Sequence, residues 1–405
     1  MTARHRLALT DWLACAARGA REPAAVVARG AGDGLLDRVA AAGTAGHVLD
    51  FDDTYAPGLA HLSAATAPAA LVVGAQLGAD VATTLAAYAA GFEAMGVLTR
   101  ACHPALYDGG WHPTAVCGSA GAAVVAARLY RLDRVRERRA IALAMLRSGG
   151  LRAAFGSDGK ALQVGLATAA GVHAARLAAG GAAVDADAIA GSGAGFAEAF
   201  GVATSATTLD AMQEAADGAG TAAAENWNKA YPCCLQTHAA IDAALALGGP
   251  PAADARLTVA VHPVSRQAAA LDEVADGLQA KFSIPYLTAY ALLRGAPRLD
   301  SFEHVDGETA ALARRVRVRT DATLGASEAI LELDGRTAAQ ITAPRGSPAN
   351  PLDAAMLAVK VRSLAGDALD GALDDPDRPA RSLLGAAGVE YTRTRVPACR
   401  AGDDS

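Results

Sequence analysis

Lysine, aromatic residues and charged residues are all scarce in this chain of 405 residues. Aromatic side chains make up 4% and charged side chains 19%, whereas hydrophobic residues reach 52%. Disordered chains need low hydrophobicity and high charge, so disorder as the dominant state is excluded. Alanine and glycine are abundant. Alanine is the best helix former and small side chains let helices approach closely, which predicts a mainly helical globular protein.

The sequence also lacks the features of nucleic-acid-binding and membrane proteins. It has a net charge of −6 and no long run of Lys and Arg, although phosphate backbones require a clustered basic surface. The longest uncharged stretch, residues 54–79, contains polar residues and is rich in Ala rather than Leu, so its transfer into lipid is weakly favourable. Asp11 and Arg18 interrupt the first apolar run, which argues against a signal peptide. We therefore expect a cytoplasmic protein without nucleic-acid or membrane partners.

Common cofactor and metal motifs are missing. The six cysteines have no C-x-x-C spacing, which disfavours zinc-ribbon and thioredoxin-like sites. The chain has no G-x-G-x-x-G after a strand, no P-loop, no H-E-x-x-H and no G-x-S-x-G. We therefore expect no cofactor and no metal.

The residue pattern of the sequence changes after residue 248 and again after residue 348. Residues 1–248 carry apolar residues at helical spacing and end in a Gly-Gly-Pro-Pro run. Residues 249–348 contain alternating segments, typical of strands, and a hairpin with an Asp-Gly turn, which predicts a smaller α+β domain. Helical spacing returns in residues 349–405, which we expect to pack back on the first domain.

Only four of the 36 basic residues are lysines: Lys160, Lys229, Lys281 and Lys360. Arginine stays protonated, whereas a buried lysine can exchange protons, so the rare lysines are candidates for chemistry. Lys160 enters a helix from a Gly-flanked turn, and Lys229 lies before a Tyr-Pro pair near His238. Surface positions are an equally good interpretation for these two. For Lys281 and Lys360 we favour ordinary surface positions.

A short Gly- and Pro-containing stretch concentrates polar side chains, namely Asp50, Asp52, Asp53, Thr54 and His61. A carboxylate can fix the tautomer of an imidazole, which then moves protons near neutral pH. In a second interpretation Asp52 or Asp53 caps a helix or turn, and we expect at least one of them to do so. A carboxylate run could also bind a divalent metal, but no second dense acidic cluster lies nearby in the sequence.

His112 lies between Trp111 and Pro113, where the sequence predicts the start of a helix. The positive end of the helix dipole there favours a neutral imidazole or a bound anion. A capping histidine is an equally good interpretation. We expect the histidines outside these motifs to be structural: His5, His47, His103, His173, His262 and His304.

Together, these His, Lys, Asp, Tyr and Thr residues suit proton abstraction without a cofactor. The proton would come from a carbon next to a carboxylate or carbonyl group. Cationic and neutral donors would hold the substrate carboxylates and stabilise an enolate-like intermediate.

Five motifs resemble the MmgE/PrpD superfamily, which includes 2-methylcitrate dehydratase, cis-aconitate decarboxylase and iminodisuccinate epimerase. They occur in the order of the family and span most of the chain: Leu49–Thr54, Gly110–Ala123, Ala154–Gly165, Lys229–Leu245 and Lys281–Tyr286.

The resemblance implies a helical domain completed by the C-terminal segment, a smaller α+β domain, a homodimer, and metal-free catalysis between the two domains. By matching motif positions it assigns catalysis to Asp50, His61, His112 and Lys160. It assigns substrate binding to Thr54, Lys229, Cys234, His238 and Tyr286, of which Tyr286 is the weakest match.

The sequence departs from the decarboxylase-like pattern at three places. The loop between Thr54 and His61 is one residue longer and resembles that of the epimerase-like subgroup. Cys234 and Gln163 stand where decarboxylases carry histidines. The loss of two imidazoles argues against decarboxylation of a tricarboxylate.

We expect a proton-abstraction enzyme of the lyase type, a dehydratase or decarboxylase, acting on a small di- or tricarboxylate. His112 or Lys160 would be the acid/base group, and Lys229 and His61 would position carboxylates. Three alternatives stay open: an epimerase of an iminodisuccinate-like diacid, a carboxylate-binding protein without catalysis, and a metal-dependent hydrolase built on the aspartates of the Asp50–Asp53 run with His61.

Overall fold

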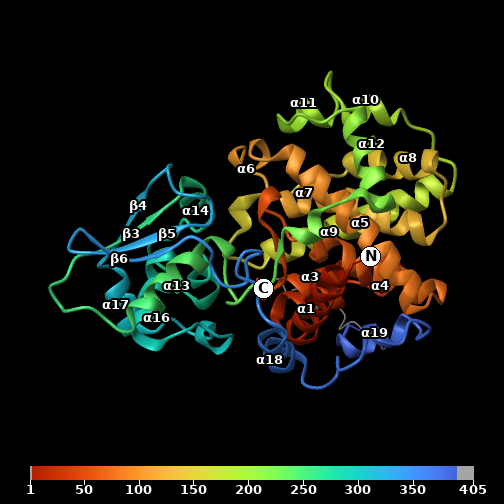
Figure 1. Cartoon of the computed structure of the whole chain (residues 1–405). Helices are drawn as coiled ribbons and strands as arrows, with labels where there is room; N and C mark the ends of the chain where they lie inside the picture. Colours follow the sequence, from red (N-terminus) through yellow and green to blue (C-terminus); the bar gives the residue numbers. More distant parts are fainter. Residues whose placement is uncertain (1, 390–405) are drawn as a thin grey trace, which may run out of the picture.

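A computed structural model describes residues 2–389 and shows two bodies joined side by side, one helical and one containing a small sheet (Figure 1). This arrangement confirms the predicted fold class, mainly α with a smaller α+β domain. The C-terminal part of the expected returning segment, residues 390–405, lies outside the described residues.

The helical body is built around α7, which packs against α4, α5, α8 and α9. Its helices are α1 (Ala3–Gly19), α2 (Pro23–Gly30), α3 (Leu35–His47), α4 (Leu62–Leu77), α5 (Val81–Cys102), α6 (Ala105–Asp108), α7 (Pro113–Leu129), α8 (Arg134–Met145), α9 (Gly159–Ala179), α10 (Ala186–Ala190), α11 (Phe196–Phe200) and α12 (Ala206–Glu214). Short 3-10 or π turns lie at Ala56–Gly58, Arg152–Ala154, Ala215–Ala219, Ala222–Ala224, Leu235–Thr237 and Asp300–Phe302.

Small residues allow the close helix packing that the composition predicts. A Cβ atom on Gly171 of α9 would lie 2.1 Å from the carbonyl oxygen of Ser119 on α7. On Gly165 it would lie 2.2 Å from the carbonyl oxygen of Ala40 on α3. Glycine at these two positions brings α9 against both neighbours, and the first turn of α9 carries Lys160.

Within residues 2–389, one helix, α5, is long and apolar enough to cross a membrane. Most of that segment, 78%, is buried within the structure. The core helix of a globular protein has the same length and composition, so the feature is weak evidence for a membrane span.

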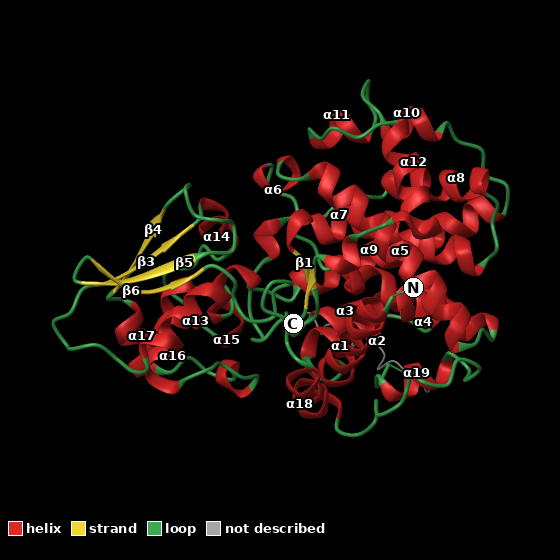
Figure 2. Cartoon of the chain, in the orientation of Figure 1, coloured by secondary structure: helices red, strands yellow, loops and turns green. Residues whose placement is uncertain are grey.

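The second body contains a four-stranded sheet in the order β4-β3-β5-β6 (Figure 2). Its strands are β3 (Leu257–Val261), β4 (Val316–Thr320), β5 (Ala329–Leu333) and β6 (Arg336–Ile341). β3 pairs parallel with β4 and antiparallel with β5. Asp334 and Gly335 form the β5–β6 turn with φ of +50° and +79°, as a tight Asp-Gly hairpin requires.

Helices cover the sheet and extend the second core. They are α13 (His238–Leu247), α14 (Pro263–Ala268), α15 (Gly277–Ala280), α16 (Ile284–Arg294) and α17 (Gly307–Ala313). α13 packs against α16, β5 and β6. This second core includes Tyr231, Cys233 and Cys234, and Tyr107 also packs into it.

The last helices lie against the helical body. α18 (Ala354–Ala365) packs on α1, and α19 (Arg381–Ala386) packs on α4 (Figure 1). A small ribbon, β1 (Thr54–Tyr55) paired antiparallel with β2 (Asn226–Trp227), lies near the junction of the two bodies (Figure 2). It brings the segment after α3 next to the segment that carries Lys229.

Candidate active site

A small cavity of about 40 Å³ lies where the two bodies meet. Seven of the nine predicted site residues line it: Asp50, Thr54, His61, His112, Lys160, Lys229 and Cys234. The other lining residues are Leu59, Tyr107, Phe155, Leu235, Gln236, Ala268 and Phe282. The volume accommodates a few water molecules.

Asp50 is the centre of charge in the cavity. Its backbone lies in the left-handed region, with φ of +53°, three residues after the end of α3. Its Oδ1 lies 3.0 Å from Lys160 Nζ and 2.7 Å from Lys229 Nζ. Burial alone would raise the pKa of Asp50, but the two ammonium groups outweigh it and hold that pKa well below its usual range. The carboxylate is therefore ionised.

The Lys229 ammonium donates its hydrogen bonds to Asp50. Its ammonium also donates to the backbone carbonyl of Asp50 at 2.9 Å, and its side chain is buried. Burial would lower the pKa of Lys229, but Asp50 and Asp52 raise it above its ordinary value. Lys229 holds Asp50 in place rather than standing free for a substrate.

His47, which we expected to be structural, lies in the middle of the cluster, so that expectation was wrong. Its Nδ1 lies 2.9 Å from Asp52 Oδ2, and its Nε2 lies 3.0 Å from Lys160 Nζ. A carboxylate can only accept, so Nδ1 carries the proton and Nε2 accepts from Lys160. Burial lowers the pKa of His47 despite the nearby Asp52, which keeps the ring neutral.

His61 is held by the same carboxylate. Its Nδ1 lies 3.3 Å from Asp52 Oδ2 and 3.4 Å from Thr54 Oγ1. Nδ1 therefore donates to Asp52, and Nε2 keeps a lone pair 3.7 Å from Asp50 Oδ1. Burial lowers the pKa of His61 to about 3, so the free ring is neutral. The arrangement presents a proton acceptor at the cavity.

His112 presents an N–H donor to the cavity, whereas His61 presents a lone pair. It is the residue before α7, as the sequence predicted, and its Nδ1 lies 2.8 Å from Gln163 Nε2. The Gln163 amide is oriented by Leu151, whose N–H donates to Oε1 at 2.9 Å. Gln163 thus donates to Nδ1, so the ring proton lies on Nε2. Burial and the neighbouring Lys160 lower the pKa of His112 well below its ordinary value, so the cavity meets a neutral N–H donor.

The pKa values of the two remaining aspartates of the run, Asp52 and Asp53, are shifted in opposite directions. Burial would raise the pKa of Asp52, but His47 and His61 lower it far below its ordinary value. Asp53 accepts from Asn226 Nδ2 at 3.0 Å, and burial raises its pKa to about 8. Neither lies at a helix start in the described chain, so the helix-cap interpretation was wrong, whereas the turn-cap interpretation stays a prediction.

Lys281 and Lys360 are buried, so our preference for surface positions was wrong for both. Lys281 donates to the Leu49 carbonyl at 2.7 Å, and burial lowers its pKa to about 8. Lys360 donates to the Phe51 carbonyl at 2.7 Å and lies 2.6 Å from Asp11 Oδ1. The four lysines of the chain therefore all contact residues 49–51 or their carboxylate.

Two predicted substrate-binding residues lie outside the cavity lining. The hydroxyl of Tyr286 accepts from the backbone N–H of Asp306 at 2.9 Å within the core of the second body. His238 is buried at the start of α13, 5.1 Å from the Tyr231 ring between centroids. Burial lowers the pKa of His238 to about 3. Neither side chain lines this cavity.

His47, Asp52 and His61 have donor atoms within 4.8 Å of one another, which is compatible with a metal site by spacing alone. Both nitrogens of His47 already have hydrogen-bond partners, and one of these is the ammonium of Lys160. A cation there would have to displace those bonds beside a positive charge. The donor set therefore fits a hydrogen-bonded network better than a metal.

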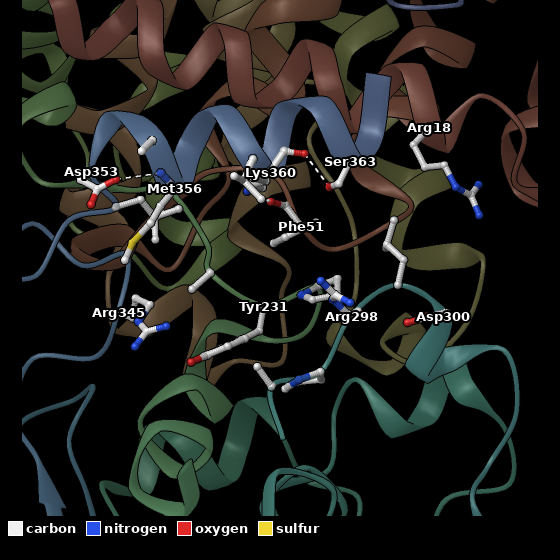
Figure 3. Close-up of a pocket in the computed structure, with 18 of the residues that line it drawn as sticks. Arg18, Phe51, Tyr231, Arg298, Asp300, Arg345, Asp353, Met356, Lys360 and Ser363 are labelled. Atoms are coloured by element: carbon white, nitrogen blue, oxygen red, sulfur yellow. Dashed lines mark hydrogen bonds between the residues drawn. The ribbon is translucent and has the colours of Figure 1, made fainter. Parts of the chain in front are cut away.

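A larger hollow of about 860 Å³ lies along α18 and shares no lining residue with the cavity. Met356 and Lys360 lie on the α18 side, and Tyr231, Arg298 and Arg345 lie opposite (Figure 3). No histidine lines it. His61 and His112 line the smaller cavity instead.

Comparison with protein families matches both parts of the chain. The MmgE/PrpD N-terminal domain matches residues 35–208, and the MmgE/PrpD C-terminal domain matches residues 231–378. The search of curated proteins gave no match. The two domain matches occur in the order of the family and cover most of the chain, including every residue of the cavity lining except Lys229. The chain belongs to the MmgE/PrpD family.

Proposed function

We propose that the protein is a cofactor-independent lyase that removes a proton from carbon in a small di- or tricarboxylate. The observation that carries the proposal is the pairing of two neutral imidazoles with opposite polarity in one cavity. His61 offers a lone pair at Nε2, and His112 offers a proton at Nε2.

His61 is the general base in this proposal. It takes the proton from the carbon next to a substrate carboxylate, and the electron pair moves into that carboxylate. The resulting imidazolium is stabilised by Asp52 at Nδ1 and by the nearby Asp50. A buried carboxylate that orients an imidazole and balances its charge is a recurrent device for such a step.

His112 is an electrophile rather than a proton source. Loss of its Nε2 proton would create an imidazolate, whereas a hydrogen bond from Nε2 stabilises the enolate oxygen at little cost. Lys160 uses two donors, one to His47 and one to Asp50, and keeps a third. That third N–H makes Lys160 the general acid.

In a dehydration the carbon–oxygen bond of the intermediate then breaks, and the leaving hydroxide takes a proton from Lys160. The products are an alkene and water. Compared with the roles expected from the sequence, His61 moves from positioning to base. Lys229 moves from holding a substrate carboxylate to holding Asp50.

Epimerisation is the second candidate. The loop before His61 resembles the epimerase-like subgroup, and Cys234 replaces a cavity imidazole of the decarboxylase pattern. In this reaction Lys160 returns a proton to the opposite face of the carbanion, and no group leaves. The proposal then changes only in its last step.

Proton NMR in deuterated water tests the proposal. The protein is incubated with 2-methylcitrate, cis-aconitate, iminodisuccinate and related diacids, and a His61→Ala variant is the control. A new alkene signal or loss of carbon dioxide supports a lyase. Exchange at the α-carbon without a new product supports the epimerase. The absence of exchange and product across the panel contradicts both and favours a binding protein. The homodimer stays a prediction, which light scattering after size-exclusion chromatography checks.

A further inference from the structure

Gln236 lines the cavity, although no motif match singled it out. It lies in the short turn Leu235–Thr237, directly before α13 of the second body, and only 6% of it is exposed. His61 and His112 belong to the helical body. Gln236 therefore meets a ligand from the body that does not carry the two imidazoles.

The side-chain amide of Gln236 is oriented by Ser265. Ser265 Oγ lies 2.7 Å from Gln236 Oε1 and 3.3 Å from the carbonyl oxygen of Ala326. The shorter separation is typical of an O–H···O bond, whereas N–H···O bonds are usually about 2.9–3.0 Å long. The Ser265 hydroxyl therefore donates to Oε1, which leaves the two N–H groups of Nε2 for other partners.

Those two N–H groups have no acceptor within the protein. Gln236 Nε2 is buried and has no hydrogen-bond partner among the described residues. A buried donor without an acceptor is costly, and each such group in a native structure calls for an explanation. Water can serve as the acceptor in the empty cavity, and a ligand that displaces this water has to supply an acceptor in its place.

We infer that Gln236 Nε2 donates to a hydroxyl or keto oxygen of the substrate and thereby selects oxygen over an ammonium group at that position. An amide N–H can only donate. A hydroxyl oxygen accepts through its lone pairs, whereas an ammonium group has three donors and no acceptor. The inference rests on the proposed function, because it assumes that the substrate occupies this cavity. It favours the hydroxy acid that a dehydratase uses over a diacid that carries a protonated amine.

Titration by ligand-observed NMR tests the assignment without turnover, with acids that differ in a single substituent. Malate, succinate and aspartate carry a hydroxyl, a hydrogen and an ammonium group at the same carbon, and citrate and tricarballylate differ only in a hydroxyl. We expect the parent to bind malate about tenfold or more tightly than aspartate, and each hydroxy acid more tightly than its counterpart without the hydroxyl.

Gln236→Met keeps the length of the side chain and removes the donor, so the preference for the hydroxyl should disappear. Gln340→Met, on exposed strand β6, is the matched control, and thermal unfolding confirms that each variant is folded. If Gln236→Met does not fold, Ser265→Ala takes its place. Without the Ser265 hydroxyl the amide of Gln236 can rotate, so the preference should weaken, and an unchanged preference overturns the inference.

The outcomes separate the role of Gln236 from the proposed function. A preference for the hydroxyl that is present in the parent and absent in Gln236→Met supports the inference, even if the parent turns over none of the acids. The same preference in both proteins overturns the role of Gln236, even if the parent is an active enzyme. Equal binding of malate and succinate by the parent, tighter binding of aspartate than malate, or failure to bind either hydroxy acid also overturns it.

Discussion

Lys281 of the sheet-containing body donates a hydrogen bond to the backbone carbonyl of Leu49 in the helical body, at 2.7 Å. The next two carbonyls along the chain accept from other lysines, that of Asp50 from Lys229 and that of Phe51 from Lys360. Three consecutive carbonyls are thus held by lysines from three distant segments. This clamp fixes the loop that carries the central carboxylate.

Replacement of Lys281 by methionine should release one end of this clamp. The Leu49 carbonyl would lose a charged donor, which predicts destabilisation by about 1–3 kcal/mol. Chemical denaturation measures it, with Arg336→Met on β6 as the control. An unchanged free energy of unfolding would show that the bond contributes nothing.

The same variant should change the pH dependence of stability. The pKa of Lys281 is lowered to about 8, below the value of about 10.4 in an unfolded chain. Between these values the unfolded state binds more protons, so this lysine makes stability rise with pH. The rise, at most about 1.4 kcal/mol per pH unit, should be absent in Lys281→Met. Equal slopes for parent and variant between pH 8 and 10 would contradict the assignment.

Asp52→Asn should impair proton abstraction more than binding. An asparagine cannot balance the imidazolium of His61, so kcat should fall by about 10²–10⁴-fold with little change in KM. Steady-state kinetics on the substrate found by NMR makes the measurement. A variant with parental kcat would remove His61 from the role of base.

Asp53→Asn is predicted to behave differently from its neighbour. The pKa of Asp53 is raised to about 8, so the folded protein keeps this proton at pH values where the unfolded chain has lost it. Its stabilising contribution is complete below about pH 4 and declines as the pH rises toward 8. The parent should therefore lose stability between about pH 5 and 8 relative to Asp53→Asn. Parallel curves in denaturation experiments would show that Asp53 is ionised in the fold.

Gln163→Leu should allow His112 to adopt either neutral tautomer. The variant loses the donor that holds Nδ1 unprotonated, so nitrogen NMR should show a mixture of the two neutral tautomers instead of the Nε2–H form. We expect kcat to fall by about 10–100-fold, because part of the population no longer points a donor at the enolate. A single Nε2–H tautomer in the variant would mean that another contact sets it.

Treatment with a chelator should leave the activity unchanged. The atoms of His47 that could bind a metal are already hydrogen-bonded to Asp52 and Lys160. Dialysis against EDTA followed by the NMR assay checks this expectation. Loss of activity that zinc or magnesium restores would instead support the metal-dependent hydrolase.

The sequence predicted the local elements and most of the cavity because their signals are local. The alternation around β3 and the Asp-Gly turn between β5 and β6 depend on neighbours in the chain. The motif matches named seven lining residues for the same reason. Tyr286 and His238 belong to the same motifs, but Tyr286 packs in the core of the second body and His238 is buried at the start of α13.

The residues that the sequence misplaced depend on contacts between distant segments. His47 meets Lys160 across 113 residues, and Lys360 meets Phe51 across 309. The spacing of residues within one segment cannot predict a contact with a distant segment. The scarcity of lysine was the available signal, and it applied equally to Lys281 and Lys360, which we placed on the surface.

The small volume of the cavity has a consequence for access. A space of about 40 Å³ is far too small for a dicarboxylate, so the side chains that line it have to move before a ligand enters. If the two bodies separated to make that room, the hydrogen bond from Lys281 to Leu49 would break, and the loop that carries Asp50 would lose one of its lysine contacts. Admission of a ligand by that route would thereby be coupled to the position of the central carboxylate.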